Sequence, residues 1–310
     1  MVRAVIVGRW RRRSLLALAL TATVAPGLLL TACRDGRSLA ETKGFAILNT
    51  GDVQGSTEPC SCKQSLGGLA RRASAVAGAR RQGDVLLLEA GNVLSAGYDP
   101  EQGSTEESAA VMAAMEAMHY DAMAIGDADA ANGHEWLRSW QEGADFAVLS
   151  ANLMLGDRLV AQPDAMFERG GVTVAVLGLT AMPSDALPDG LTVTDPVLAA
   201  QEYLRDLTRR DDVIVVLGAL GPEVERRILA EVQHVDVLVG GGTAEPCGEV
   251  SQTSLPAHVC AGPYGEYLGI TTLTPADGSQ ERTYSFRPVP LDATFAEDRE
   301  IAELLRQYLR

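Results

Sequence analysis

Short apolar runs alternate with amphipathic stretches from about residue 45 to residue 240. This alternation is typical of strands and helices wound into an α/β core. The runs at 172–177 and 213–217 are apolar except for Thr173, which predicts strands that are buried on both faces of a sheet. The predicted strands cover 45–50, 85–89, 122–125, 146–150, 172–179, 213–217 and 235–239, and helices lie between most of them.

A helix is predicted over 66–81, where apolar and basic positions fall on different faces. Its apolar face carries Leu69, Ala73, Val76 and Ala77. Its basic face carries Arg71, Arg72, Arg80 and Arg81. Because charged side chains are rarely buried without a partner, we expect all four arginines to be solvated.

The last third of the chain has a different pattern. Val259 and the runs at 267–273 and 283–287 are separated by Gly and Pro turns, which predicts an antiparallel meander. After Pro288 and Pro290, an acidic start at 297–300 opens a helix that runs to Leu309. We therefore expect a domain over 44–290, followed by a C-terminal helix within 291–310.

The first 32 residues have the pattern of an export signal. Three arginines at 11–13 precede an apolar stretch over 14–32, which ends in small residues before Cys33. The pattern predicts a lipoprotein signal peptide over 1–32, lipidation of Cys33 and a polar tether over 33–43. A transmembrane anchor is the alternative, although Pro26 and Gly27 interrupt the stretch. The arginines fit either the general secretory route or the twin-arginine route.

This leader predicts that the protein faces the periplasm, anchored to a bacterial membrane by a lipid. Arg34 follows Cys33, which favours the outer membrane where the cell has one. The chain has 26 basic and 41 acidic residues and a formal net charge of −15. Because Arg3, Arg9 and Arg11–Arg13 all lie in the leader, the rest is more acidic still. This charge argues against nucleic acid as a partner.

Four cysteines follow Cys33, namely Cys60, Cys62, Cys247 and Cys260. An even number of cysteines in an oxidising compartment favours disulfides, for which three pairings are open. A Cys247–Cys260 bridge would close a short loop and stabilise the fold by about 3 kcal/mol. Cys60 and Cys62 have two further interpretations: a structural bridge to one of the distant cysteines, or a bridge to each other with a redox role.

Eight segments together resemble the N-terminal catalytic domain of the bacterial 5'-nucleotidase family, within the calcineurin-like metallophosphoesterases. They are 47–55, 67–72, 85–92, 120–127, 149–152, 171–180, 237–241 and 261–269. The resemblance implies a single-domain α/β fold, an αββα sandwich, without the family's C-terminal nucleotidase domain. It also implies two divalent metals at the carboxyl ends of the central strands, which would activate water and clamp a phosphoester.

Most of the metal-binding pattern is degraded in this chain. Asp52 matches the first aspartate, but Gln54 stands where a histidine belongs and Asn92 replaces the bridging aspartate. The family's Asn-His-Glu signature is Asp127-Ala128-Asp129, and its Gly-His-Thr-His motif has become 241–244, without histidine. The resemblance leaves Asp52, Gln54, Asn92, Asp127 and Asp129 as a vestigial set. This set is compatible with one divalent metal, and less readily with two.

The chain gains cysteines where it loses histidines. Residues 58–62 resemble the Glu-Pro-Cys-Gly-Cys sequence of an exported branch of this family. The first and last metal motifs of the family fold converge, so we expect Cys60 or Cys62 to lie close to Cys247, above Asp52 and Asp127. Thiolates would prefer a soft or borderline metal.

Three functions are therefore compatible with the sequence. The first is an exported lipoprotein that no longer hydrolyses phosphoesters and uses a Cys60/Cys62 pocket for binding or redox chemistry with an unidentified partner. The second is a residual metal-dependent phosphoesterase. The third is a scaffold in which every cysteine is structural.

Overall fold

The protein is described by a computed structural model, which covers residues 44–94, 105–182, 187–188, 190–207, 213–274 and 282–309. The predicted signal peptide, Cys33 and the whole predicted tether lie outside these residues, so the leader remains a prediction. No helix of the described residues is long and apolar enough to cross a lipid bilayer.

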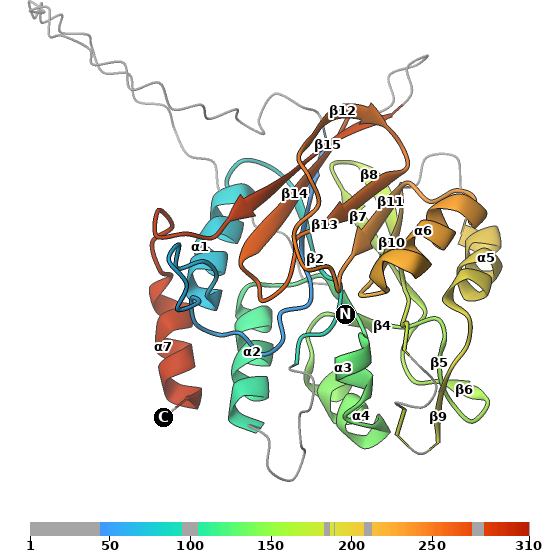
Figure 1. Ribbon diagram of the computed structural model, residues 1–310, viewed down its shortest axis with the longest axis horizontal. Helices are drawn as coiled ribbons and strands as arrows, with labels where there is room; N and C mark the ends of the chain where they lie inside the picture. Colours follow the sequence, from blue (N-terminus) through green and yellow to red (C-terminus); the bar gives the residue numbers. More distant parts are fainter. Residues whose placement is uncertain are drawn as a thin grey trace, which may run out of the picture. The chain divides into compact units, whose positions relative to one another are not determined.

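Two sheets face each other at the centre of the fold (Figure 1). The larger sheet has the strand order β12-β15-β14-β1-β2-β3-β4. Its parallel half consists of β1 (Ala46–Thr50), β2 (Val85–Glu89), β3 (Ala122–Ala124) and β4 (Ala147–Leu149). Its antiparallel half consists of β14 (Tyr267–Thr274), β15 (Thr283–Pro290) and β12 (Val250–Ser254).

The smaller central sheet has the order β13-β11-β10-β8-β7. Its strands are β7 (Asp164–Arg169), β8 (Val172–Gly178), β10 (Val213–Gly218), β11 (Val237–Gly240) and β13 (Ala257–Cys260). As the apolar runs predict, β10 is buried throughout, and β8 is buried from Val174 onward. A further small sheet joins β5 (Leu153–Leu155), β6 (Arg158–Leu159) and β9 (Leu191–Val193).

Helices cover the outer faces of both central sheets. Figure 1 shows α1 (Leu69–Arg80), α2 (Thr105–Ala117) and α7 (Arg299–Tyr308) on one side, and α5 (Pro196–Leu207) and α6 (Gly221–Glu231) on the other. Alternate residues of β1 point to different layers: Ile47 packs between the sheets and Leu48 packs under the helices. The predicted αββα sandwich is therefore confirmed.

The structure corrects the predicted meander in the last third. β14 and β15 are antiparallel neighbours as expected, but Val259 lies in β13, which runs parallel to β11 in the other sheet. Its Cα is paired with that of Val239. Both residues are buried between the sheets, and this tertiary burial outweighs the turn pattern that suggested a local hairpin.

Candidate functional site

The vestigial metal residues follow the carboxyl ends of β1, β2 and β3, the edge where parallel strands bring their loops together. The loops after β1 and β2 are bonded to each other, since Asp52 N donates to Gly91 O at 2.8 Å and Gln54 N donates to Asn92 O at 2.9 Å. Asp52, Gln54 and Asn92 all adopt left-handed backbone angles, with φ of 54°, 51° and 56°. Such conformations cost free energy and persist only where the surroundings impose them.

Asp129 is fully buried, and its carboxylate is the acceptor for several backbone N–H groups. It lies in the short helix α3 (Asp127–Ala130), and its carboxylate accepts hydrogen bonds from the backbone N–H groups of Asn92, Val93, Leu94 and Gly126, at 2.8–3.2 Å. Burial raises the pKa of Asp129 to about 6, although the four N–H groups oppose this rise. These contacts occupy its two oxygens with protein donors.

Asn92 is fixed in a similar way. Its side-chain oxygen accepts from Ala128 N at 3.0 Å, so its NH₂ group faces Asp52 and donates to Oδ1 at 3.3 Å. An N–H donor therefore points at the Asp52 carboxylate from the position where the resemblance implies a bridging carboxylate that binds metal. Gly242 and Ala244 have no donor atom to offer. The residues present do not fit a dinuclear metal centre.

The remaining members of the set do not complete a site. Asp127 and Gln54 are partly exposed. Within the described parts of the chain, Asp52, Asp127 and Asp129 do not form a group of three ligand atoms close enough for one ion. One group does meet that condition, and it consists of Cys60, Cys62 and Glu266, whose ligand atoms lie within 4.8 Å of one another.

Cys60 and Cys62 are bonded to each other in a compact loop between β1 and α1. Their Cα atoms lie 5.2 Å apart. The loop is closed by Cys60 N, which donates to Leu66 O at 2.8 Å, and by Ser65 N, which donates to Cys62 O at 3.1 Å. The side chain of Arg71 donates to the carbonyl of Ser65 and ties the loop to α1. The disulfide is thus presented on a defined backbone.

The two sulfur atoms have different surroundings. Cys62 is exposed, whereas Cys60 is partly buried and its sulfur accepts a hydrogen bond from Leu66 N at 3.2 Å. An N–H donor stabilises a thiolate more than it stabilises a thiol. The bond therefore favours negative charge on Cys60 whenever the disulfide opens.

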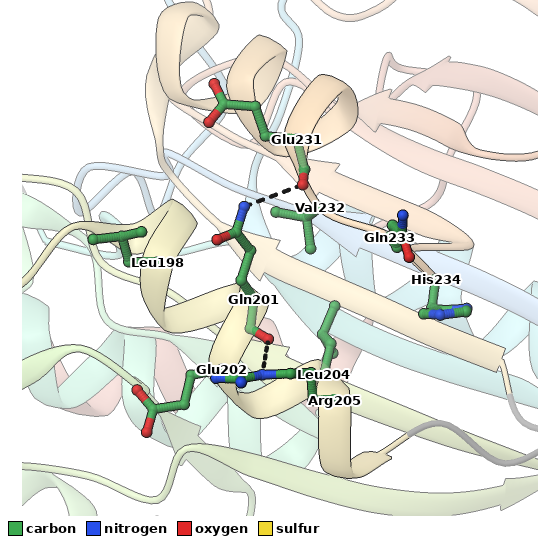
Figure 2. A pocket seen from close by; sticks show the side chains of 9 residues that line it. All are labelled: Leu198, Gln201, Glu202, Leu204, Arg205, Glu231, Val232, Gln233 and His234. Atoms are coloured by element: carbon green, nitrogen blue, oxygen red, sulfur yellow. Dashed lines mark hydrogen bonds between the residues drawn. The ribbon is translucent and has the colours of Figure 1, made fainter.

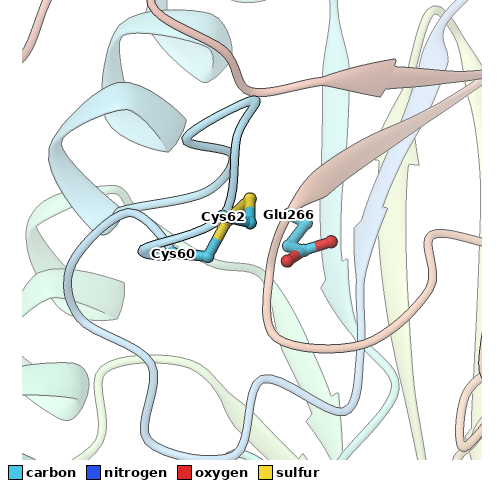
Figure 3. Close-up of side chains that lie close together, drawn as sticks. All are labelled: Cys60, Cys62 and Glu266. Atoms are coloured by element: carbon cyan, nitrogen blue, oxygen red, sulfur yellow. A yellow bond between two sulfur atoms is a disulfide. The ribbon is translucent and has the colours of Figure 1, made fainter.

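Glu266, just before β14, lies beside this disulfide (Figure 3). Its backbone is held by Leu291, whose N–H donates to Glu266 O and whose carbonyl accepts from Gly67 N, both at 2.9 Å. Gly67 has a φ of +88°, and a Cβ there would meet Gly265 O at 3.4 Å. That distance is an ordinary contact, so it is the positive φ that favours glycine at the turn where the cysteine loop meets Glu266. Sequence reasoning missed Glu266, because no local pattern indicates which loop packs against it.

Cys247 and Cys260 form the second disulfide, with Cα atoms 5.1 Å apart. Cys247 N also donates to Cys260 O at 3.0 Å. Of the three open pairings, the structure has the one that joins each cysteine to its neighbour along the chain. Cys247 is therefore not bonded to the Cys60/Cys62 loop and does not belong to the group around Glu266.

The structure also corrects the prediction for Arg72, which is 1% exposed and not solvated. Its Nη1 donates to Tyr120 Oη at 3.2 Å, Tyr120 Oη lies 2.7 Å from Thr50 Oγ1, and Thr50 Oγ1 donates to Glu89 Oε2 at 2.6 Å. Burial raises the pKa of Glu89 to about 7, although Arg72 opposes the rise. Arg80 is also only partly exposed and donates to the carbonyls of Met118 and His119, so of the four arginines only Arg81 is exposed as predicted. Helical periodicity alone cannot distinguish these positions.

A pocket of about 680 Å³ lies elsewhere, between α5 and the end of α6 (Figure 2). Gln201 spans it and donates to Glu231 O at 3.1 Å. Both helices end shortly before the strands β10 and β11 begin, so the pocket lies at the amino ends of these strands. It is separate from the strand ends that carry the vestigial site.

Comparison with known proteins gives sequence relatives and similar structures. No protein-family model matches the chain. The chain is 29% identical to a 5'-nucleotidase of Diplobatis ommata over 319 aligned residues, covering 90% of this chain and 54% of that protein. It is 29% identical to a 5'-nucleotidase of Homo sapiens over 299 residues, covering 83% and 51%. The chain thus spans about half the length of the curated relatives that it matches.

Solved structures show the same fold at lower identity. A 5'-nucleotidase precursor of Thermus thermophilus superposes with a TM-score of 0.75 and 24% identity, covering 85% of this chain and 58% of that one. A calcineurin-like phosphoesterase of Bacillus subtilis superposes with a TM-score of 0.71 and 20% identity, covering 86% and 96%. The chain is therefore a sequence relative of the 5'-nucleotidases, and its fold is that of their N-terminal calcineurin-like metallophosphoesterase domain.

Proposed function

We propose that this protein is an exported lipoprotein in which a 5'-nucleotidase-like fold no longer hydrolyses phosphoesters and instead presents the Cys60–Cys62 pair for thiol–disulfide exchange. One observation carries the proposal: Cys62, an exposed residue, is bonded to Cys60, whose sulfur accepts an N–H hydrogen bond. The compartment follows from the predicted leader, and the membrane attachment follows from lipidation of Cys33.

The non-hydrolytic part rests on the chemistry of the vestigial set. Hydrolysis by this fold needs a metal-activated water and a proton donor for the leaving group. Ala128 replaces the proton donor, and loss of a general acid alone typically costs about a hundred- to ten-thousand-fold in rate. Asn92 and Asp129 direct their side chains at protein partners, which removes ligands as well.

In the proposed exchange step the partner attacks the sulfur of Cys62 rather than that of Cys60. A thiolate of a dithiol partner attacks the exposed Cys62, forms a mixed disulfide with it and expels Cys60 as a thiolate, stabilised by the Leu66 N–H group. The partner's second thiolate then attacks the mixed disulfide and releases Cys62. The partner ends with a disulfide and this protein with two thiols, so two electrons and two protons have moved to Cys60 and Cys62.

The stability that the Cys60–Cys62 bridge adds is too small to explain why the bridge is present. In the chain-entropy model a bridge between residues two apart is worth about 1.5 kcal/mol, against about 3 kcal/mol for a loop the length of that between Cys247 and Cys260. A purely structural role therefore suits Cys247–Cys260 better than it suits Cys60–Cys62.

Single-cysteine variants test the exchange step. The Cys60→Ser variant of the purified full chain should accumulate a mixed disulfide at Cys62 with a small dithiol-derived disulfide, and the Cys62→Ser variant should accumulate much less at Cys60. Peptide mass mapping locates the adduct. If the native disulfide resists a dithiol reductant under non-denaturing conditions, the scaffold interpretation replaces the proposal.

Residual hydrolysis is the second candidate, favoured by sequence relatives that are 5'-nucleotidases. Nucleoside monophosphate and a chromogenic phosphomonoester should remain unhydrolysed with Mn²⁺, Mg²⁺, Co²⁺ or Zn²⁺. Turnover that disappears in an Asp52→Ala variant would establish the enzyme instead. A Glu58→Gln variant, changed at an exposed position, controls for nonspecific effects on the preparation.

A further inference from the structure

We infer that Cys60, Cys62 and Glu266 form a binding site for a borderline divalent metal of the Zn²⁺ type when the disulfide is reduced. The inference rests on the proposed exchange function, because only the reduced pair supplies two thiolates. It adds a ligand class and a third residue to that site.

The geometry is compatible with one ion. Two sulfur ligands of a tetrahedral zinc site lie about 3.8 Å apart. The two sulfur atoms and a Glu266 oxygen already lie within 4.8 Å of one another, so small side-chain rotations after the S–S bond breaks are enough. Figure 3 shows that the carboxylate comes from a segment separate from the cysteine loop. A bound ion would therefore cross-link two parts of the chain.

The donor set selects the metal. Two thiolates disfavour hard ions such as Mg²⁺ and Ca²⁺, and a carboxylate is a poor ligand for Cu(I). Thiolate and carboxylate together suit Zn²⁺, which takes both at about 2.0–2.3 Å. Three protein ligands leave the fourth position to water, so the site would be open and exchangeable.

The surrounding backbone is already arranged for this role. Leu66 N points at the Cys60 sulfur, and such a bond supports a thiolate ligand as it supports a leaving thiolate. Glu266 is held by its backbone bond with Leu291, while its side chain stays partly exposed. When the metal binds, each thiol releases one proton to solvent, and no electron is transferred.

The test uses the full chain, reduced anaerobically with a phosphine and then freed of the reductant. Co²⁺ is the spectroscopic probe, and added Zn²⁺ should displace it from the site. We expect one equivalent of Co²⁺ to bind with a thiolate-to-cobalt charge-transfer band that is absent from the oxidised protein. Glu266→Gln should weaken the affinity at least about tenfold, and Glu58→Gln, a matched change beside the same loop, should leave it unchanged.

Glu266→His keeps the inference falsifiable if the glutamine variant is perturbed, because imidazole is a zinc ligand and should restore affinity. Equal affinity in Glu266→Gln and the parent would overturn the three-residue site, as would absence of the charge-transfer band.

Thiol counting after dithiol treatment distinguishes a failure of the metal site from a failure of the exchange function. A pair that is readily reduced but binds no metal refutes the metal site and leaves the exchange function standing. If only a phosphine reduces the pair, the exchange function is refuted. The Co²⁺ titration then tests the metal site independently of that function.

Discussion

The buried carboxyl of Glu89 should make the protein less stable as pH rises from acid to neutral. Its pKa is raised from 4.5 to about 7 by burial at the end of β2. Between these two values the folded protein holds a proton that the unfolded chain has released. The free energy of unfolding must therefore fall as pH rises through this window, and the contribution becomes constant above about pH 7.

The magnitude follows from the same two pKa values. Their difference corresponds to about 3 kcal/mol in total, of which about 2.5 kcal/mol falls between pH 5 and pH 8. Glu89→Gln mimics the protonated carboxyl and keeps an oxygen that can accept from Thr50. Over this range the free energy of unfolding of the Glu89→Gln variant should fall by about 2–3 kcal/mol less than that of the parent. Asp129 has the same sign of pH dependence and is present in both proteins, so its contribution cancels apart from its coulombic interaction with Glu89, which the substitution removes together with the charge.

Equilibrium urea unfolding followed by circular dichroism at pH 5, 6, 7 and 8 measures this difference. Asp157→Asn, on an exposed turn, controls for the change in net charge. Parallel curves for the parent and Glu89→Gln would refute the reasoning, because Glu89 would then be ionised in the native protein. In that case the charge of Arg72, which is buried nearby, would outweigh desolvation.

Three further outcomes are expected. Replacing Cys33 with Ser should release the protein from the membrane or leave an uncleaved precursor; unchanged fractionation and mass would exclude lipidation. Replacing both Cys247 and Cys260 with Ala should lower the free energy of unfolding by about 3 kcal/mol, and an equal loss on replacing Cys60 and Cys62 would contradict the loop-length argument. Asp129→Asn should cost at least about 3 kcal/mol, because an amide cannot accept from four N–H groups as a carboxylate does; unfolding at the parent's urea midpoint would show that those bonds are dispensable.

Much of the fold could be predicted from the sequence because local and tertiary signals agree. The runs that become β8 and β10 are apolar on both faces, as strands covered on both sides must be. Val259 was misplaced since its neighbours in β11 lie about twenty residues away, and the nearby turns suggested a closer partner. Partner choice between sheets depends on burial, which a turn pattern does not encode.

The sequence was enough to predict the vestigial positions and the two cysteines, but not the contacts that their side chains make. The vestigial positions could be found because their order along the chain matches a family motif. What each side chain contacts could not: Asp129 looks like a ligand in sequence, but four backbone donors surround it. Arg72 and Glu266 were missed for the same reason, since their partners come from segments far along the chain.

The four N–H groups that converge on Asp129 come from the loop after β2 and the start of α3, and the loop after β2 is also bonded to the loop after β1. The Asp129 carboxylate and these backbone bonds together hold three loops in place without a metal ion. Chelators should consequently leave the melting temperature of the oxidised protein unchanged. Folding of these loops would then be independent of the supply of transition metals.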